Sequence, residues 1–180
     1  MNFSPQLITD LILIKPTIQA DSRGYFAETF RQDLFEDAVG YKVDFIQDNE
    51  SQSFKGVLRG LHYQLEPYAQ SKLVRVVKGR VLDVAVDIRK SSSTFGQHVA
   101  VELTEENNHQ LFIPRGFAHG YVVLSESATF SYKVDNYYAQ NFDHGIAFDD
   151  PYLGINWHLP VTDLLLSDKD KKHQKLISAS

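Results

Sequence analysis

Short segments in which apolar and polar side chains alternate recur along this chain at intervals of about 8–12 residues, each bounded by turn residues. The alternation is clearest over residues 82–88, where Leu82, Val84 and Val86 are separated by single residues. Gly79 divides this segment from residues 73–78, which is typical of a hairpin. Many short strands joined by frequent turns pack as a sandwich or a barrel. The sequence therefore predicts an all-β fold with a few short helices.

The predicted elements cover most of the chain. Strands are expected at residues 7–14, 25–30, 43–51, 56–64, 73–78, 80–88, 97–103, 109–114, 120–124 and 129–134. The segment 7–14 alternates poorly, so we expect it to be buried on both faces or covered by a partner subunit. A helix is predicted over Gln32–Val39, with Gly40 as its C-terminal stop. We expect residues 1–180 to form a single domain with an N-terminal strand extension, and the charged tail from Asp163 to form a short helix packed on the barrel.

Charge and composition narrow the class of partner. The 180 residues carry a formal net charge of −5, and the sequence pI is about 5.8. This charge argues against nucleic acid as a partner but leaves room for a small phosphorylated ligand held by a few cationic side chains. The chain has no cysteine, which excludes disulfides, thiol catalysis and thiolate metal sites. The apolar run Leu11–Ile14 is too short for a signal or membrane segment, so we expect a soluble cytoplasmic protein.

A predicted strand rich in apolar residues also carries polar and charged side chains. It covers residues 56–64, Gly-Val-Leu-Arg-Gly-Leu-His-Tyr-Gln. If side chains alternate along this strand, Leu58 and His62 share one face and Arg59 lies on the other. A titratable imidazole and a permanent cation are costly in such a strand unless partner groups satisfy them or a function uses them. This stretch is therefore the first candidate for a functional site.

The predicted strand 43–51 carries three hydrogen-bonding side chains on one face. Gln47, Asn49 and Ser51 alternate along it, which is unusual for a core. The pattern fits either a solvent-exposed face or a hydrogen-bonding wall for a polar ligand.

Two stretches share the spacing of a pair of known motifs. The matching positions are Gly56, His62, Gln64, Lys72 and Gly79 in the first stretch, and Pro114, Gly116 and His119 in the second. They resemble the paired motifs of the cupin superfamily, which implies a double-stranded β-helix, or jelly-roll barrel. Metal-binding cupins have a second histidine where this chain has Gln64 and a glutamate where it has Lys72. An ammonium group cannot ligate a metal ion and repels one, so we expect a metal-free cupin in which Lys72 offers its charge to a developing oxyanion.

Six motifs follow one another over nearly the whole chain. They are residues 21–28 (Asp-Ser-Arg-Gly-Tyr-Phe-Ala-Glu), 47–49 (Gln-Asp-Asn), 57–64, 70–75 (Gln-Ser-Lys-Leu-Val-Arg), 114–120 (Pro-Arg-Gly-Phe-Ala-His-Gly) and 167–170 (Ser-Asp-Lys-Asp). Together they resemble the dTDP-4-dehydrorhamnose 3,5-epimerases, whereas residues 171–180 match that family only loosely. The resemblance implies an isomerase that inverts C3 and C5 of dTDP-4-dehydro-6-deoxy-D-glucose to give dTDP-4-dehydro-L-rhamnose. This product is the precursor of the L-rhamnose of lipopolysaccharide or cell-wall polysaccharide. The resemblance further implies a homodimer that uses no metal and no redox cofactor.

The same resemblance implies four catalytic residues. Epimerisation beside a ketone needs a base for the α-proton, a cation or donor for the enolate oxygen, and an acid on the opposite face. His62 matches the base, and an imidazole is well suited to proton abstraction at neutral pH. Lys72 matches the residue at the C4 oxygen, and Tyr132 matches the acid. Asp170 matches the carboxylate that orients the histidine, with its neighbour Asp168 as a rival.

The remaining residues implied by the resemblance would bind the nucleotide sugar. Arg23 and Arg59 match phosphate contacts, for which a guanidinium group is well shaped. The other expected contacts are Glu28, Gln47, Asp48 and Asn49 for the base, the sugar or the arginines, Phe26 and Tyr138 for stacking, Asp143 and Lys169 for further substrate contacts, and His119 for the hexose. The early residues of this set are expected to act across the homodimer.

Three other functions stay open on the sequence alone. A mono-epimerase or a 3,4-ketoisomerase acting on a related dTDP-4-keto-6-deoxy sugar would use nearly the same residues. A metal-dependent cupin such as a dioxygenase is a second alternative, against which Lys72 argues. A sugar-nucleotide-binding jelly roll without catalytic activity is a third. The histidines without motif support are expected on the surface or in packing, and they are His98, His109, His144, His158 and His173.

Overall fold

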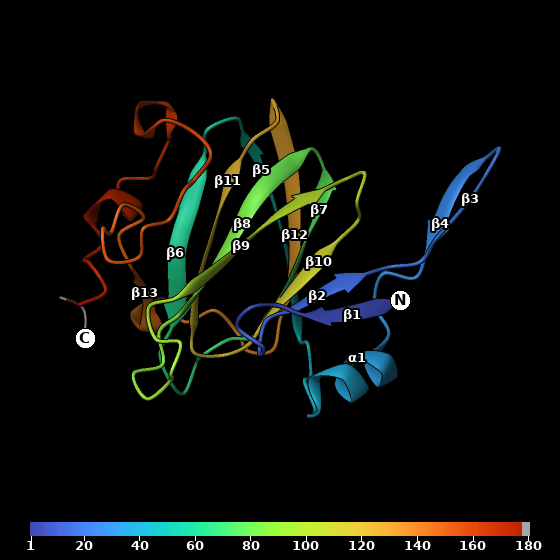
Figure 1. Cartoon of the computed structure of the whole chain (residues 1–180), viewed down its shortest axis with the longest axis horizontal. Coiled ribbons are helices and arrows are strands. Elements are labelled where there is room, and N and C mark those ends of the chain that lie inside the picture. The colour runs from blue at the N-terminus through green and yellow to red at the C-terminus, as the bar shows by residue number, and fades with distance from the viewer. Residues whose placement is uncertain (178–180) are drawn as a thin grey trace.

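The computed structural model describes residues 1–177 as two antiparallel sheets and a separate hairpin (Figure 1). The six-stranded sheet has the order β1 (Asn2–Pro5), β2 (Ile12–Lys15), β10 (Gln110–Ile113), β7 (Lys72–Lys78), β12 (Ser127–Val134) and β5 (Gln47–Phe54). The five-stranded sheet has the order β13 (Asp143–Gly145), β6 (Leu58–Gln64), β11 (Phe117–Val123), β8 (Arg80–Asp87) and β9 (His98–Thr104). The all-β prediction is confirmed, and the paired sheets agree with the expected jelly-roll barrel.

The main core fills the space between the two sheets. Val74 and Phe130 of the six-stranded sheet meet Val81 and Phe117 of the five-stranded sheet in one buried cluster. All four side chains are nearly or fully excluded from solvent. Burial of large apolar side chains at this seam is the main contribution that holds the barrel closed.

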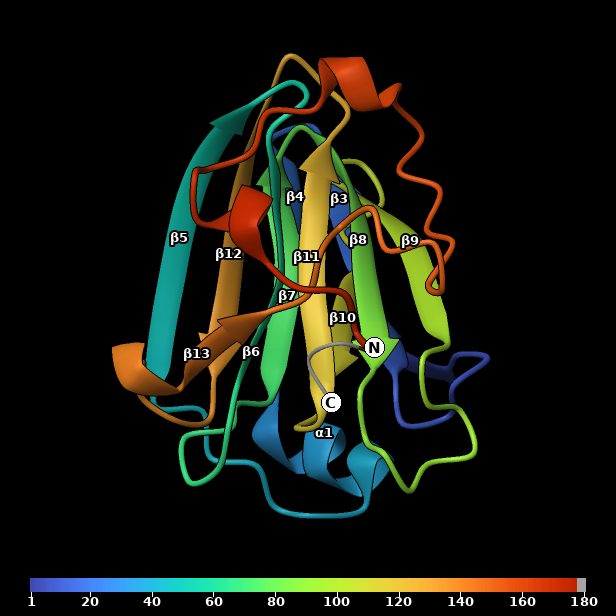
Figure 2. The same cartoon turned by 90° about the vertical axis from the view of Figure 1, so that its left-hand side faces the viewer.

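A second core covers the outer face of the five-stranded sheet. The alternating residues Leu82 and Val84 of β8 lie in this cluster, packed with Trp157, Leu164 and Leu176 of the C-terminal segment. Both faces of β8 are therefore buried, and only Arg80, the first of its eight residues, is exposed. Figure 2 shows the C-terminal segment crossing this face.

The C-terminal tail packs on the barrel, as predicted, but it is not an α-helix. It contains the short 3-10 turns η2 (Val161–Asp163) and η3 (Asp170–Lys172), joined by residues 164–169. A third 3-10 turn, η1 (Gln140–Phe142), precedes β13. The tail is held by burial of separated apolar residues and by an isolated bridge to Val57, so its local sequence does not need a continuous helix.

The helix α1 (Gln32–Val39) is confirmed with the predicted bounds. Gly40 ends it in the left-handed conformation with φ of 84°, and its N–H donates to the carbonyl of Glu36. Phe35 is fully buried against Leu73 and Phe112 on the outer face of the six-stranded sheet. This contact fixes α1 below the barrel (Figure 1).

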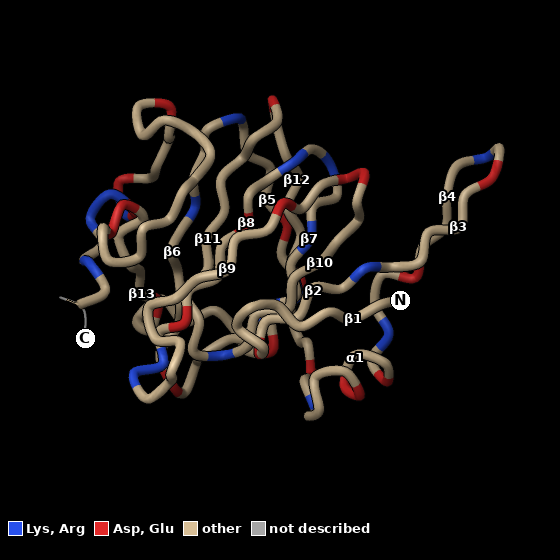
Figure 3. The backbone as a smooth tube through the Cα atoms, in the orientation of Figure 1, with Lys and Arg blue, Asp and Glu red and all other residues tan. Residues whose placement is uncertain are grey.

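Strands β3 (Ile18–Asp21) and β4 (Gly24–Ala27) form a hairpin that projects away from the barrel (Figures 1 and 3). The turn at residues 21–24 is as predicted, and the N–H of Arg23 donates to Oδ1 of Asp21. The strand predicted over 25–30 is shorter than expected, and its partner at residues 18–21 was not predicted. Tyr25 and Phe26 are largely exposed on this hairpin.

Several other strand boundaries differ from the predictions for local reasons. The predicted strand 7–14 begins only at Ile12, because residues 6–11 form a turn in which the N–H of Gln6 donates to the carbonyl of Leu11. β5 begins at Gln47 rather than at residue 43. β11 begins at Phe117 rather than at residue 120, directly after the turn at Gly116, which has φ of 85°. Within residues 1–177, no helix has the length and apolar character needed to cross a membrane.

Candidate active site

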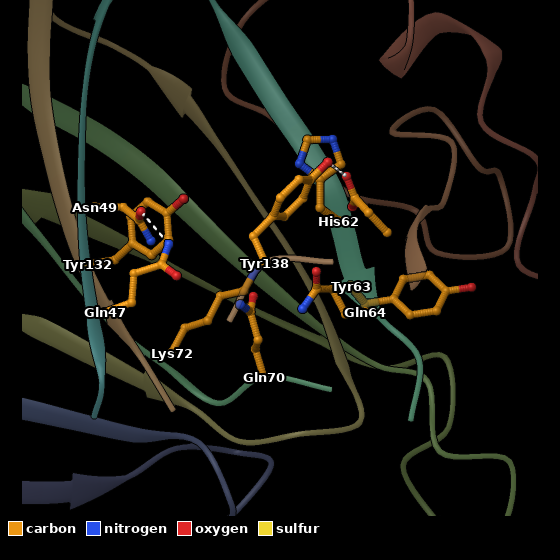
Figure 4. Close-up of a pocket in the computed structure, with 10 residues that line it drawn as sticks. Gln47, Asn49, His62, Tyr63, Gln64, Gln70, Lys72, Tyr132 and Tyr138 are labelled. Atoms are coloured by element: carbon orange, nitrogen blue, oxygen red, sulfur yellow. Dashed lines mark hydrogen bonds between the residues drawn. The ribbon is translucent and has the colours of Figure 1, made fainter. Parts of the chain in front are cut away.

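A pocket of about 310 Å³ opens between β5 and β12 of one sheet and β6 of the other (Figure 4). Seven of the predicted site residues line it, and they are Gln47, Asn49, His62, Lys72, Tyr132, Tyr138 and Asp143. Tyr63, Gln64 and Gln70 complete the lining. Because the two sheets contribute different residues, a ligand in the pocket meets distinct chemistry on its two sides.

A bulge in β6 turns Arg59 and His62 toward the same side. Arg59 pairs with Tyr121, and His62, three residues later, pairs with His119, two residues earlier on β11. The extra residue on β6 breaks the strict alternation of side chains. The expectation that Arg59 and His62 lie on opposite faces is therefore wrong. Nε of Arg59 donates to Oγ of Ser53 on β5, which places the guanidinium group between the sheets.

His62 and Asp170 form a close pair. Nε2 of His62 lies 2.6 Å from Oδ1 of Asp170, and the aspartate side chain is only 5% exposed. Burial would raise the pKa of Asp170, but the hydrogen bond and charge of His62 and a hydrogen bond from Ser167 lower it below its ordinary value. The rival, Asp168, is 92% exposed and lies near Lys171 instead. The structure thus places Asp170, and not Asp168, against the histidine.

Lys72 stands at the start of β7 and reaches into the pocket (Figure 4). Burial lowers the pKa of its ammonium group to about 8, while the negative charges of Asp143 and Asp83 act in the opposite direction. Lys72 is therefore a cation at neutral pH that is only weakly hydrated. Such a group interacts strongly with negative charge that develops on a ligand.

Tyr132 lies on β12, in the sheet opposite His62 (Figure 4). Burial raises the pKa of its hydroxyl, as do Tyr121 and Asp143, whereas Arg59 lowers it. The net shift is upward, so the hydroxyl carries its proton at neutral pH. A proton donor and an imidazole thus face the pocket from different sheets.

The inner face of β5 forms a hydrogen-bonding wall rather than a solvent-exposed face. Nε2 of Gln47 donates to Oδ1 of Asn49 over 2.8 Å, and both residues line the pocket. Further along the strand, the hydroxyls of Ser51 and Tyr121 lie 2.9 Å apart. Asp48 points to the other side of the strand, where it accepts from Nζ of Lys133. The structure therefore does not bring Asp48 into this pocket.

The residues present do not fit the metal site of a metal-binding cupin. The amide of Gln64 is occupied by the backbone: Nε2 donates to the carbonyls of Tyr68 and Tyr137, and Oε1 accepts from the N–H of Ala139. Lys72 brings a cation to the position of the usual glutamate. A divalent ion there would meet a repelling charge and an amide already used to anchor a loop.

His119 lies behind the pocket and is not among the residues that line it. Its Nε2 is 2.7 Å from Oδ1 of Asp83, and both side chains are buried. Sequence reasoning missed Asp83, although a carboxylate within the apolar segment 81–86 is a signal of a paired interior charge. Burial lowers the pKa of His119, and its contact with Asp83 opposes this shift.

A polar cluster stands at the mouth of the pocket. The hydroxyl of Tyr138 donates to Oδ2 of Asp143 over 3.0 Å, and Nζ of Lys169 donates to the same oxygen. Asp143 pairs with Gln64 across β13 and β6. Three of the predicted substrate contacts are thus brought together.

Arg23, Phe26 and Glu28 are not brought to this pocket within one chain. Arg23 and Phe26 line a separate hollow of about 300 Å³ on the projecting hairpin. The side chain of Arg23 is 88% exposed and pairs only with Asp21 among the described residues. Both signs of charge lie at the hairpin tip (Figure 3).

Comparisons with known proteins identify the family of this chain. A sequence model of the family described as dTDP-4-dehydrorhamnose 3,5-epimerase matches residues 5–178. The chain is 56% identical over 179 residues to the dTDP-4-dehydrorhamnose 3,5-epimerase of Shigella flexneri, covering 99% of this chain and 98% of that one. The crystal structure of dTDP-4-dehydrorhamnose 3,5-epimerase from Elizabethkingia anophelis is 46% identical, with a TM-score of 0.95 and coverage of 99% and 97%. The dTDP-6-deoxy-D-glucose-3,5-epimerase of Legionella pneumophila, in complex with dTDP-4-keto-L-rhamnose, is 46% identical, with a TM-score of 0.95 and coverage of 99% and 94%. The chain belongs to the dTDP-4-dehydrorhamnose 3,5-epimerase family.

Proposed function

We propose that this protein inverts C3 and C5 of dTDP-4-dehydro-6-deoxy-D-glucose and so produces dTDP-4-dehydro-L-rhamnose for dTDP-L-rhamnose biosynthesis. The observation that carries the proposal is the arrangement of His62 on one sheet, paired with Asp170 of η3, and Tyr132 on the other sheet, with Lys72 in the same pocket. The membership of the family supports it independently.

The reaction at each carbon begins with proton removal. Neutral His62 takes the proton from the carbon next to the C4 ketone, and the electron pair of the broken C–H bond moves onto the C4 oxygen as an enolate. Asp170 holds the ring and stabilises the imidazolium that forms. The ammonium group of Lys72 faces the charge on the oxygen.

Inversion is completed when a proton returns from the other side. Tyr132 gives its proton to the carbon from the face opposite His62, the enolate collapses to the ketone, and the configuration is reversed. The tyrosinate and the imidazolium then exchange protons with solvent. No electron leaves the substrate, so the cycle needs no redox partner.

The rest of the pocket suits the nucleotide. The guanidinium group of Arg59 can donate two parallel hydrogen bonds to phosphate oxygens. The side-chain amides of Gln47 and Asn49 can hydrogen-bond a base or a sugar. The exposed ring of Tyr138 at the mouth is available for stacking on a base.

We further propose that the protein acts in the cytoplasm as a homodimer in which each projecting hairpin completes the pocket of the partner. The exposed rings of Tyr25 and Phe26 lie on a hairpin that leaves its own barrel, which is typical of an element that docks elsewhere. Arg23 would then bring a second guanidinium group to the phosphates.

Solvent exchange tests the activity. The protein is incubated with dTDP-4-keto-6-deoxyglucose in heavy water, and deuterium is located by NMR for the wild type and for His62→Ala. Deuterium at C3 and C5, lost in the variant, is the expected result. Deuterium at one carbon would show a mono-epimerase, and bound nucleotide without any exchange would show a binding protein; either result overturns the double epimerase.

A further inference from the structure

His173, which no motif singles out, packs against the catalytic pair directly after η3. Its ring lies edge-on to the ring of His62, with centroids 5.5 Å apart and an interplanar angle of 88°. It does serve packing, as expected, but its neighbour is the proposed catalytic base. This position lies in the stretch that resembles the family only loosely.

The ring of His173 is held without hydrogen bonds. Both of its nitrogens are buried, and neither has a hydrogen-bond partner among residues 1–177. A buried polar atom without a partner is costly and calls for an explanation such as a bound ion. Gly145 makes room for the ring, because a Cβ at that position would overlap the imidazole.

One ligand atom from each of His62, Asp170 and His173 lies within 4.8 Å of the other two. We infer that these three side chains form a binding site for Zn²⁺ or a similar divalent transition-metal ion, and that the bound ion blocks the catalytic base. The site is an inhibitory one. It shares His62 with the cupin metal position, at which Lys72 and Gln64 exclude an ion, but its other two ligands are Asp170 and His173.

The donor set and the distances suit this ion. Two imidazoles and one carboxylate are a common zinc set that leaves a fourth position for water. Ligand atoms at tetrahedral zinc are separated by about 3.3 Å, which follows from bond lengths of about 2.0–2.1 Å. The contact of 2.6 Å between His62 and Asp170 must therefore open by about 0.7 Å, and His173 must approach by at most about 1.5 Å. His173 breaks no hydrogen bond with a described residue when it moves.

The surroundings support a bound cation. Either ring nitrogen of His173 can turn to a metal ion, because neither one makes a hydrogen bond to a described residue. A cavity of about 450 Å³ reaches His173 from solvent and gives the ion a route. Lys169 at this cavity is neutralised by Asp143, which leaves Lys172 as the opposing charge among the cavity-lining residues.

Zinc binding by the whole protein tests the inference without any substrate. The purified protein is stripped with EDTA and titrated with zinc chloride in a calorimeter, beside His173→Phe. Phenylalanine keeps the ring that rests on Gly145 and His62 but has no nitrogen, so the variant should fold. His109→Phe serves as a control, because it removes a histidine that is not part of the cluster.

The expected result is one zinc ion per chain in the wild type and in His109→Phe, with affinity about 10–100-fold weaker or worse in His173→Phe, since even groups that only support a ligand contribute that much. A wild type that takes up no zinc, or a His173→Phe variant that binds it equally well, overturns the site. Zinc should also inhibit epimerisation, and EDTA should reverse the inhibition; this second test rests on the proposed function. The calorimetric test does not depend on that function, so the zinc site and the proposed function can fail separately.

Discussion

Gly60 of β6 and Gly120 of β11 lie backbone against backbone: a Cβ on Gly60 would be 2.5 Å from the Cα of Gly120. This close approach is at the bulge that follows Arg59 and precedes His62. Because neither glycine has a side chain, the strands can meet while β6 carries its extra residue. The contact thus allows a phosphate-binding candidate and the proposed base to face the same space.

Replacing Gly60 by alanine should destabilise the fold strongly. The backbone there has φ of 143°, and a new methyl group would meet Gly120, so strain and overlap add to a cost of roughly 2–5 kcal/mol in the free energy of unfolding. Urea denaturation measures it. Gly40→Ala is the matched control, with φ of 84° and nothing within 4 Å, and should cost only about 1 kcal/mol. Equal costs for the two variants would contradict the close approach.

The parts of the fold that were predicted are those with a strong local pattern. The alternation of Leu82 and Val84 and the stop at Gly40 lie in contiguous sequence, so α1 and β8 could be placed. The strand at residues 18–21 lacks an apolar pattern and exists through pairing with β4. The tail forms 3-10 turns because distant apolar partners hold it, and such partners leave no periodicity in the tail itself.

The site was predicted where residues sit at motif spacing and missed where geometry depends on other strands. His62 and Lys72, which lie in two of the motifs, meet in one pocket with Tyr132, which the resemblance implied without a motif of its own. The side on which Arg59 lies depends on a bulge, which strict alternation does not anticipate. His173 belongs to no motif, and its contact with His62 arises from the path of the tail.

Asp170→Asn should reduce kcat by about 10²–10⁴-fold, because the amide no longer stabilises the imidazolium or fixes the tautomer of His62. Asp168→Asn is the control for this change, since its side chain is 92% exposed, and it should leave kcat within about twofold. Steady-state rates of both variants decide the matter. A larger loss in the second variant would transfer the role to Asp168.

Activity should decline as the pH rises through about 8, the pKa of Lys72 in the folded protein. Above that value the ammonium group loses its proton and the enolate loses its cation. Tyr132 has a raised pKa and does not titrate in this range. A profile of kcat/KM against pH measures the limb, and Asp143→Asn should move it to lower pH, because the charge of Asp143 raises the pKa of Lys72. If Asp143→Asn leaves the decline in kcat/KM at the same pH, the decline does not come from the titration of Lys72.

The contribution of Lys72 to stability should rise with pH, whereas activity falls. Lys72 has a pKa of about 8 in the fold against 10.5 as its ordinary value. Between these values the unfolded chain holds more protons at this position, so its contribution to the free energy of unfolding rises with pH. The free energy of unfolding of the wild type, minus that of Lys72→Met, should therefore rise from pH 7.5 toward pH 10 in urea denaturation, values set roughly by that titration window. A constant difference would speak against a depressed pKa.

Mixing two inactive variants should restore activity if the hairpin completes the partner's pocket. Arg23→Ala and His62→Ala proteins are combined and allowed to exchange subunits, which a pull-down with two different tags verifies. Each mixed dimer then has one intact site and one doubly defective site, so about a quarter of wild-type activity is expected at random mixing. Verified mixed dimers without activity would show that Arg23 does not act across the subunits.

Tyr132→Phe should separate proton exchange from inversion. His62 can still remove the α-proton and return a solvent-derived one to the same face, so deuterium enters the substrate while its configuration is kept. Turnover to the inverted product should fall by about 10²–10⁴-fold, the usual effect of losing a general acid. NMR of the recovered sugar nucleotide in heavy water distinguishes retained from inverted carbons. Loss of exchange together with inversion would mean that Tyr132 assists the first proton transfer, and inversion at the wild-type rate would assign the acid to another group.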